Sequence, residues 1–169
     1  MGEVGRVTVH VKYGDVEQTF SGSVEDVWLS LNRFFGEFLP SFEAAKRLVL
    51  SVDLQGLVKA CEGLIGFSKE GANLLVGKDR LTDNECLLLW LLAGYVGGSL
   101  GLVGSDCVSK EELQARLGKS GKITSTRLGE LVKSDIIVKT ADDKYRITTF
   151  GVVQMQKDIL SKIRSKISG

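Results

Sequence analysis

Residues 7–22 alternate between apolar and polar side chains, and this pattern predicts a β-hairpin. Val7, Val9 and Val11 are separated by polar residues, and a period of two is typical of a strand with one buried face. A Gly-Asp dipeptide then favours a turn into a second alternating run. Because an isolated hairpin is marginally stable in water, we expect its apolar face to pack against another element.

A wide apolar face at helical spacing follows the hairpin. Ser23 can cap this helix, and Pro40 stops it or bends the chain sharply. The apolar positions between them are Val24, Val27, Trp28, Leu31, Phe34, Phe35, Phe38 and Leu39. We interpret this face as core, with a dimer-forming or ligand-binding aromatic surface as the alternative.

The chain that follows this helix gives weaker signals. Asp53 is expected to cap a short helix, and residues 68–75 predict one or two further helical turns. The short polar segment 77–80 predicts a domain boundary. We therefore expect an N-terminal α+β module, residues 1–80, with an oligomerisation or regulatory role, and a C-terminal domain, residues 81–169.

The C-terminal domain begins with two clearly marked helices. Thr82, with Glu85 three residues later, forms a capping-box pattern, and the apolar run after it predicts a buried helix. Ser109, with Glu112 three residues later, marks the start of a shorter helix. Gly118 is expected to end that second helix, because glycine readily adopts the left-handed conformation found there.

A third helix is expected from about Thr124 to Ser134. Two strands follow, at residues 136–139 and 145–148, and a polar turn joins them. A final helix is expected to start near Phe150. The order helix, short helix, turn, helix, hairpin, helix is that of a winged helix-turn-helix domain.

Three motifs are also similar to those of known winged-helix proteins. They are Thr124-Ser125-Thr126, Arg127-Leu128-Gly129-Glu130-Leu131 and Tyr145-Arg146-Ile147-Thr148-Thr149-Phe150-Gly151. Through these motifs, residues 82–155 resemble prokaryotic and archaeal winged-helix transcription regulators. At residues 134–136 the chain has Ser-Asp-Ile, where such regulators commonly have Glu-Gly-Leu. We recognise no family in the N-terminal half.

The resemblance implies both a fold and a function. The expected fold class is α+β, with an N-terminal β-hairpin plus helices and a C-terminal winged helix-turn-helix domain. The implied function is that of a DNA-binding protein, a transcription regulator that contacts double-stranded DNA through its third helix and its wing. Regulators of this class usually bind as dimers, so we expect a homodimer.

The distribution of charge agrees with a polyanionic partner for the C-terminal part. Residues 1–118 hold 11 basic and 16 acidic residues, a net charge of −5, whereas residues 119–169 hold 11 basic and 5 acidic residues, a net charge of +6. A helix N-terminus with short polar side chains can approach bases and phosphates closely. The residues expected to contact DNA are Lys119, Ser120, Lys122, Thr124, Ser125, Thr126, Arg127, Lys133, Lys139, Lys144 and Arg146.

Several alternatives stay open at this point. Arg127 has Glu130 three residues on as an intrahelical ion-pair partner, so it is either a DNA contact or a helix salt bridge. Asp142 and Asp143 at the wing tip argue against deep insertion of the wing. A winged helix can also bind only proteins, and the alternative function is therefore a protein-protein adaptor without DNA binding. A protein partner could also bind the N-terminal module.

The dimer surface has two candidates. One is the aromatic helix after the hairpin. The other is a C-terminal stripe with spacings of three and four, formed by Val152, Met155, Ile159, Ile163 and Ile167. This stripe is only two heptads long, and it can instead close the core of its own domain.

Composition narrows the remaining classes. The chain has 169 residues, of which 43% are hydrophobic and 25% charged, which is typical of a globular protein. Cys61, Cys86 and Cys107 lie in apolar stretches without a C-x-x-C motif, and a single histidine cannot complete a usual zinc site. We expect no enzyme activity, no cofactor and no metal. With neither a signal peptide nor a membrane span recognised, we expect a cytoplasmic protein.

Overall fold

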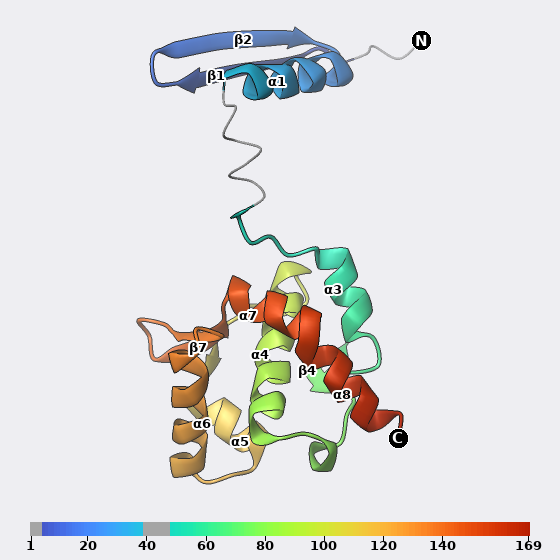
Figure 1. Ribbon diagram of the computed structural model, residues 1–169, viewed down its shortest axis with the longest axis vertical. Coiled ribbons are helices and arrows are strands. Elements are labelled where there is room, and N and C mark those ends of the chain that lie inside the picture. Colours follow the sequence, from blue (N-terminus) through green and yellow to red (C-terminus); the bar gives the residue numbers. More distant parts are fainter. Residues whose placement is uncertain (1–4, 39–47) are drawn as a thin grey trace. The chain divides into compact units, whose positions relative to one another are not determined.

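The computed structural model describes residues 5–38 and 48–169, and it contains two compact units, Met1–Val49 and Leu50–Gly169 (Figure 1). In the described residues, the first unit contains one small antiparallel sheet and the second contains two, and both units contain helices. This agrees with the expected α+β class. Within the described residues, no helix combines the length and apolar character that crossing a bilayer requires.

In its described residues, the first unit is the predicted hairpin with one helix against it. Its elements are β1 (Val7–Tyr13), β2 (Val16–Gly22) and α1 (Val24–Phe38). The strands pair with Val9 opposite Phe20, and the Phe20 ring meets the Phe34 ring edge-on, with 5.7 Å between their centroids. Ser23 caps α1 by accepting a hydrogen bond from the Asp26 backbone N–H. The expected helix end at Leu39 and Pro40 lies outside the described residues.

The apolar face of α1 is only partly core. Val27 and Phe34 are buried against the hairpin, but Trp28 is 66% exposed and Val24 is 59% exposed. A helix with one partner hairpin can bury only the stripe that faces it, and the flank of a wide apolar face then stays in contact with solvent.

Residues 50–80 belong to the second unit, so the compact units divide earlier than the boundary expected near residue 80. Their elements are α3 (Leu54–Cys61), β3 (Ile65–Ser68), β4 (Gly71–Leu74) and the 3₁₀ turn η1 (Lys78–Arg80). Leu57 and Leu64 are buried in the same core as the helix that follows, which fixes this segment to the second unit. The expectation of helical turns at 68–75 is wrong: a two-residue turn at Lys69 and Glu70 joins β3 to β4, and Gly71 begins β4 with φ of +122°.

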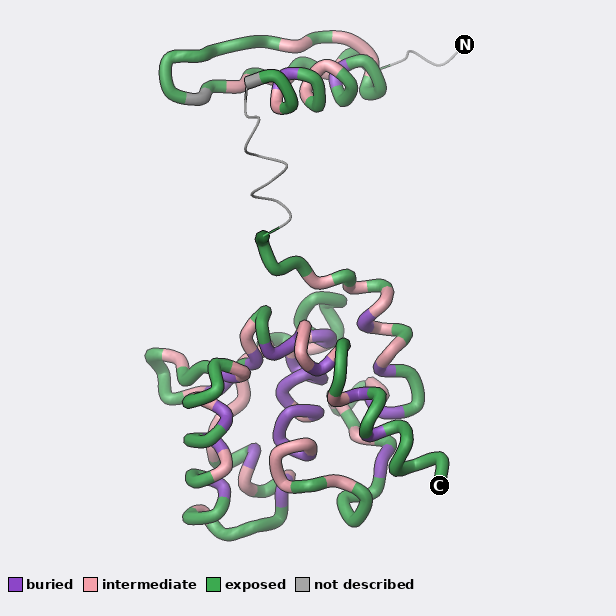
Figure 2. The backbone as a smooth tube through the Cα atoms, in the orientation of Figure 1, coloured by how far each residue is buried: buried purple, intermediate pink, exposed green. Residues whose placement is uncertain are grey.

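The centre of the second unit is α4 (Asp83–Ser99). The capping box predicted from Thr82 and Glu85 is present, with both reciprocal hydrogen bonds formed. Leu87, Leu91 and Leu92 are fully buried, and α4 is buried along most of its length (Figure 2). A helix that is apolar on all sides must be surrounded, and the other elements of this unit surround it.

The elements after α4 follow the predicted order, with one additional short strand, β5, before the second helix. They are β5 (Val108–Ser109), α5 (Lys110–Leu117), α6 (Gly121–Lys133), β6 (Ile137–Lys139) and β7 (Lys144–Ile147). Ser109 caps α5, and Gly118 ends it in the left-handed conformation with φ of +72°. The three short strands form one antiparallel sheet in the order β5-β7-β6. Helix α6 starts at Gly121, three residues before the predicted position.

The junction between the sheet and the last helix explains the Thr-x-x-Gly motif at residues 148–151. The Thr148 hydroxyl donates to the Asp135 carbonyl oxygen at 2.7 Å and accepts from the Gly151 N–H at 2.9 Å. A Cβ at Gly151 would overlap the carbonyl oxygen of Ile136, so only glycine permits this approach. Asp135 adopts φ of +58°, and it thus occupies the left-handed position where glycine was missing from the sequence motif.

The final helical run contains a change of register. It consists of α7 (Thr149–Gln154), a π-helical segment η2 (Met155–Ile159) and α8 (Leu160–Ile167). The wider π turn inserts one residue into the helical repeat, so Leu160 rather than Ile159 joins Met155 and Ile163 in the buried stripe. Val152, Met155 and Ile163 of the C-terminal stripe therefore close the core of their own unit, whereas Ile167 is exposed.

Candidate nucleic-acid interface

Helix α6 has one buried face and one solvent-exposed face. Thr124, Leu128 and Leu131 are buried against the rest of the unit. At 100° per residue, the side roughly opposite is formed by Lys122, Thr126, Gly129 and Lys133, which fall within about 60° of one another. All four of these residues are exposed. We call this set the α6 stripe.

Thr124 was expected to contact DNA, and the structure contradicts this. Its side chain is fully buried, and its hydroxyl donates to the Ser120 carbonyl oxygen at 3.0 Å. The physical reason is its spacing, because Thr124 lies four and seven residues before Leu128 and Leu131 and therefore shares their face.

Other hydroxyl groups near the start of α6 also serve the helix itself. Ser120 is the N-cap, and its hydroxyl accepts a hydrogen bond from the Ile123 N–H at 3.3 Å. The Thr126 hydroxyl donates to the Lys122 carbonyl oxygen at 3.0 Å. Both residues are exposed, as is Ser125, so their outer surfaces are accessible to a ligand.

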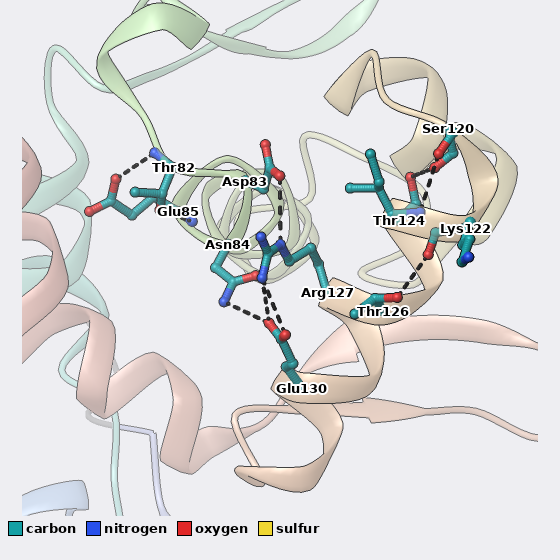
Figure 3. Close-up of polar contacts among 11 residues, drawn as sticks. Thr82, Asp83, Asn84, Glu85, Ser120, Lys122, Thr124, Thr126, Arg127 and Glu130 are labelled. Atoms are coloured by element: carbon teal, nitrogen blue, oxygen red, sulfur yellow. Dashed lines mark hydrogen bonds and ion pairs between the residues drawn. The ribbon is translucent and has the colours of Figure 1, made fainter.

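Arg127 is the predicted site residue whose partners are most clearly defined. Its guanidinium lies 3.2 Å from Glu130 on the same helix and 3.6 Å from Asp83 at the start of α4. Figure 3 shows the Arg127 side chain turned toward Asp83, while Lys122 points away from this cluster. The hydrogen bond to Glu130, then the charge of Glu130, raises the pKa of Arg127. The intrahelical salt bridge is therefore present, and Asp83 extends it into a link between two helices.

The hairpin predicted to be the wing, β6 and β7 with the turn between them, carries nearly balanced charge at its tip. Lys139 lies 2.8 Å from Asp143, and Lys144 lies 3.7 Å from Asp142. A hydrogen bond from Thr140, followed by the backbone at Asp142 itself, lowers the pKa of the Asp142 carboxyl, so it stays ionised beside Lys144. Lys139 and Lys144, both predicted to contact DNA, thus each have an acidic neighbour that offsets their charge.

Two basic residues of the last helix are occupied in holding the unit together. Arg164 donates to the carbonyl oxygens of Ala60 at 2.7 Å and Glu62 at 2.6 Å, which satisfies the end of α3. Lys166 lies 2.6 Å from Glu85. Part of the positive charge counted in residues 119–169 is therefore structural.

Some of the cations predicted to contact DNA are not neutralised by a neighbouring acid. Within the described residues, Lys119, Lys122, Lys133 and Arg146 have no ion-pair partner, and all four are exposed. Three of them lie on α6 or directly before it. Glu130, the one acidic residue of α6, is turned to Arg127.

Gly129 is a part of this surface that the sequence analysis did not single out. It lies in the interior of α6, and a Cβ placed there would meet nothing within 4 Å. Glycine inside a helix costs about 0.5–1 kcal/mol relative to alanine. Its spacing of seven from Lys122 and four from Lys133 was the signal that could have identified it.

A separate cavity of about 330 Å³ lies between the β3–β4 turn, α4, α5 and the connector after α4. Arg116 covers the Trp90 ring there, with its guanidinium carbon 3.8 Å from the ring centroid, and is also bound to Glu112 at 2.7 Å. The part of the chain that the structure describes has no group of three or more His, Cys, Asp or Glu residues placed to hold a metal ion.

The cysteines are buried or partly buried free thiols. Burial raises the pKa of Cys61 to about 11, although the nearby Arg164 acts in the opposite direction. Burial also raises the pKa of Cys86, and Cys107 is half-buried. At neutral pH the two buried thiols are protonated and poor nucleophiles.

Comparison of the chain with models of protein families, with curated proteins and with solved structures gave no match.

Proposed function

We propose that this protein binds double-stranded DNA through a winged helix formed by residues 82–155 and acts as a transcription regulator. The observation that carries the proposal is the α6 stripe. It offers two lysines without ion-pair partners on the helix side that is directed away from the core, and the residues between them are small. A convex, cationic helix face with short side chains fits the major groove and its phosphate borders.

The order of elements supports the same proposal. A buried helix, a short helix, a turn, an exposed helix and a two-stranded hairpin follow one another in residues 83–147. In winged-helix proteins the third of these helices enters the major groove and the hairpin lies beside it. Here that helix is α6.

The structure refines which residues we propose as contacts. Lys119, Lys122, Ser125, Thr126 and Lys133 are exposed on or beside α6, and Ser120 keeps its exposed N-cap position. Arg146 adds an exposed cation on β7. We assign Arg127 a positioning role, since its partners hold α6 to α4, and Lys139 and Lys144 a minor role, since acidic neighbours neutralise them.

We also propose a homodimer acting in the cytoplasm of a bacterial or archaeal cell. Two copies would engage two half-sites and multiply the affinity for DNA. Val152, Met155 and Ile163 of the C-terminal stripe are buried within their own unit. Helix α1, on which Trp28 and Leu29 are each 66% exposed, is therefore the better candidate for a contact between copies, although Ile167 of the stripe is 40% exposed. These same exposed side chains favour the second candidate function, a protein-protein adaptor.

The test compares two double variants that change the charge equally. Lys122→Ala with Lys133→Ala removes the lysines of the α6 stripe, and Lys157→Ala with Lys162→Ala removes two exposed lysines of the last helical run. Fluorescence anisotropy with a labelled duplex should show weakened binding for the first variant alone. Equal affinity for both variants, or no binding by the unaltered protein, would contradict the proposal, and the second result would favour the adaptor.

A further inference from the structure

Gly129 lacks the structural reasons that explain other glycines of the same unit. Gly118 adopts a left-handed conformation, and Gly151 lies where a Cβ would overlap a carbonyl oxygen. Gly129 has neither feature, and the space beyond its Cα is open within the described residues. Because glycine destabilises a helix interior relative to alanine, Gly129 weakens α6, and neither the backbone conformation nor the packing at this position requires a glycine.

The two lysines of the α6 stripe lie on either side of this position. Lys122 and Lys133 are eleven residues apart, which is about 16 Å along the helix axis at 1.5 Å per residue. Thr126 and Gly129 lie between them on the same side, and neither has a long side chain. Side chains in the middle of the stripe therefore project little from the helix, whereas the two ends carry long, flexible, positively charged side chains.

From this profile we propose that α6 docks on DNA side-on, with the backbone at Gly129 at the point of closest approach. Lys122 and Lys133 then reach phosphates on the two borders of the major groove, which is about 12 Å wide. This inference rests on the proposed DNA-binding function and adds a docking direction to it. Charge complementarity selects DNA as the occupant, because both ends of the stripe are cationic and Glu130, the one acidic residue of α6, lies beside the stripe and is paired with Arg127.

Docking by the helix tip alone would use a different set of contact residues. Lys119, Ser120 and Lys122 would then supply the contacts, and Lys133 at the other end of α6 would lie outside the interface. A side chain at position 129 would also be tolerated, because the middle of the helix would not touch DNA. Substitutions at Gly129 and Lys133 therefore distinguish the two docking modes.

The first part of the test adds bulk at the proposed point of closest approach. Gly129→Gln introduces a long, uncharged, helix-favouring side chain into open space, so the protein should fold normally by circular dichroism. We expect it to bind duplex DNA about tenfold or more weakly, because the added side chain holds α6 and its two lysines away from the phosphates. Ser165→Gln on α8 makes a comparable change on an exposed helix face and should bind as the unaltered protein does.

The second part counts phosphate contacts through the salt dependence of binding. Lys122→Ala and Lys133→Ala should each reduce the slope of log K against log salt concentration by about 0.9. Unchanged affinity for Gly129→Gln, together with an unchanged slope for Lys133→Ala, would overturn side-on docking while leaving the proposed function intact. Failure of the unaltered protein to bind duplex DNA would instead overturn both.

Discussion

The guanidinium of Arg127 on α6 lies 3.6 Å from the carboxylate of Asp83, the first residue of α4. Arg127 also binds Glu130, whose carboxylate accepts a hydrogen bond from Asn84 at 3.5 Å. This cluster connects the helix proposed to meet DNA with the central helix of the unit. Arg127, which was predicted to contact DNA, therefore helps to hold α6 against α4.

This relationship predicts that removing either partner weakens DNA binding by the same route. Arg127→Ala and Asp83→Asn should each lower affinity by about twofold to fivefold, and the double variant should lose little more, because both changes break one link. Titrations of labelled duplex with the three variants check this. If Arg127 contacted DNA directly, Arg127→Ala would weaken binding while Asp83→Asn would strengthen it by removing a negative charge.

Neutralising the wing acids should increase affinity. Asp142→Asn with Asp143→Asn frees Lys144 and Lys139, and asparagine accepts the left-handed conformation that Asp143 adopts with φ of +58°. Each lysine that then meets a phosphate should steepen the salt slope by about 0.9. A wing that lies away from DNA would leave both the slope and the affinity unchanged.

Two glycines in the same unit should respond in opposite ways to alanine. Gly151→Ala forces a Cβ into the Ile136 carbonyl oxygen and should lower the free energy of unfolding by about 3 kcal/mol, or prevent folding. Gly129→Ala fills open space and should raise it by about 0.5–1 kcal/mol through helix propensity. Chemical denaturation measures both. A destabilised Gly129→Ala protein would show that this glycine has a structural role after all.

The contact between Glu85 and Lys166 should make stability depend on pH in the acid range. Burial of Glu85 opposes ionisation, but hydrogen bonds from Lys166 and from the Thr82 N–H outweigh it and lower the pKa below its ordinary 4.5. A carboxyl with a lowered folded-state pKa stabilises the protein above the unfolded pKa, and this contribution disappears as the pH falls through the folded value.

Glu85→Gln should therefore lower the free energy of unfolding by about 1 kcal/mol at pH 7, and the difference from the unaltered protein should shrink below about pH 4. Urea denaturation across this pH range provides the measurement. Glu62→Gln, an exposed acid whose backbone carbonyl rather than its carboxylate accepts from Arg164, serves as the control. A constant difference between pH 3 and pH 7 would contradict the assignment.

Local signals in the sequence predicted the start of α4 and both ends of α5. Thr82, Ser109 and Gly118 act through contacts within a few residues, so their patterns determine caps without any knowledge of the fold. Residues 68–75 were harder, because a short segment interrupted by Gly71 has too few residues to show a period. The shift from Ile159 to Leu160 was also hidden, since a π turn changes the helical repeat.

In the candidate site too, features set by nearby residues were predictable from the sequence, and features set by tertiary packing were not. The burial of Thr124 was readable from its spacing to Leu128 and Leu131, because these positions share one helix face. The first partner of Arg127, Glu130, was predicted, but its second partner was not, because Asp83 is distant in the sequence and only packing of α6 on α4 brings it near. The pairing of the wing lysines with neighbouring acids lay between these cases, since a turn of unknown geometry separates them.

The most direct test of DNA binding by α6 is the salt dependence of the affinity of the unaltered protein for random duplex DNA. Phosphate contacts by Lys119, Lys122, Lys133 and Arg146 predict a slope of log K against log salt concentration of about −3.6, and Lys122→Ala with Lys133→Ala should make it shallower by about 1.8. A slope near zero, or a slope that this double variant leaves unchanged, would contradict the account.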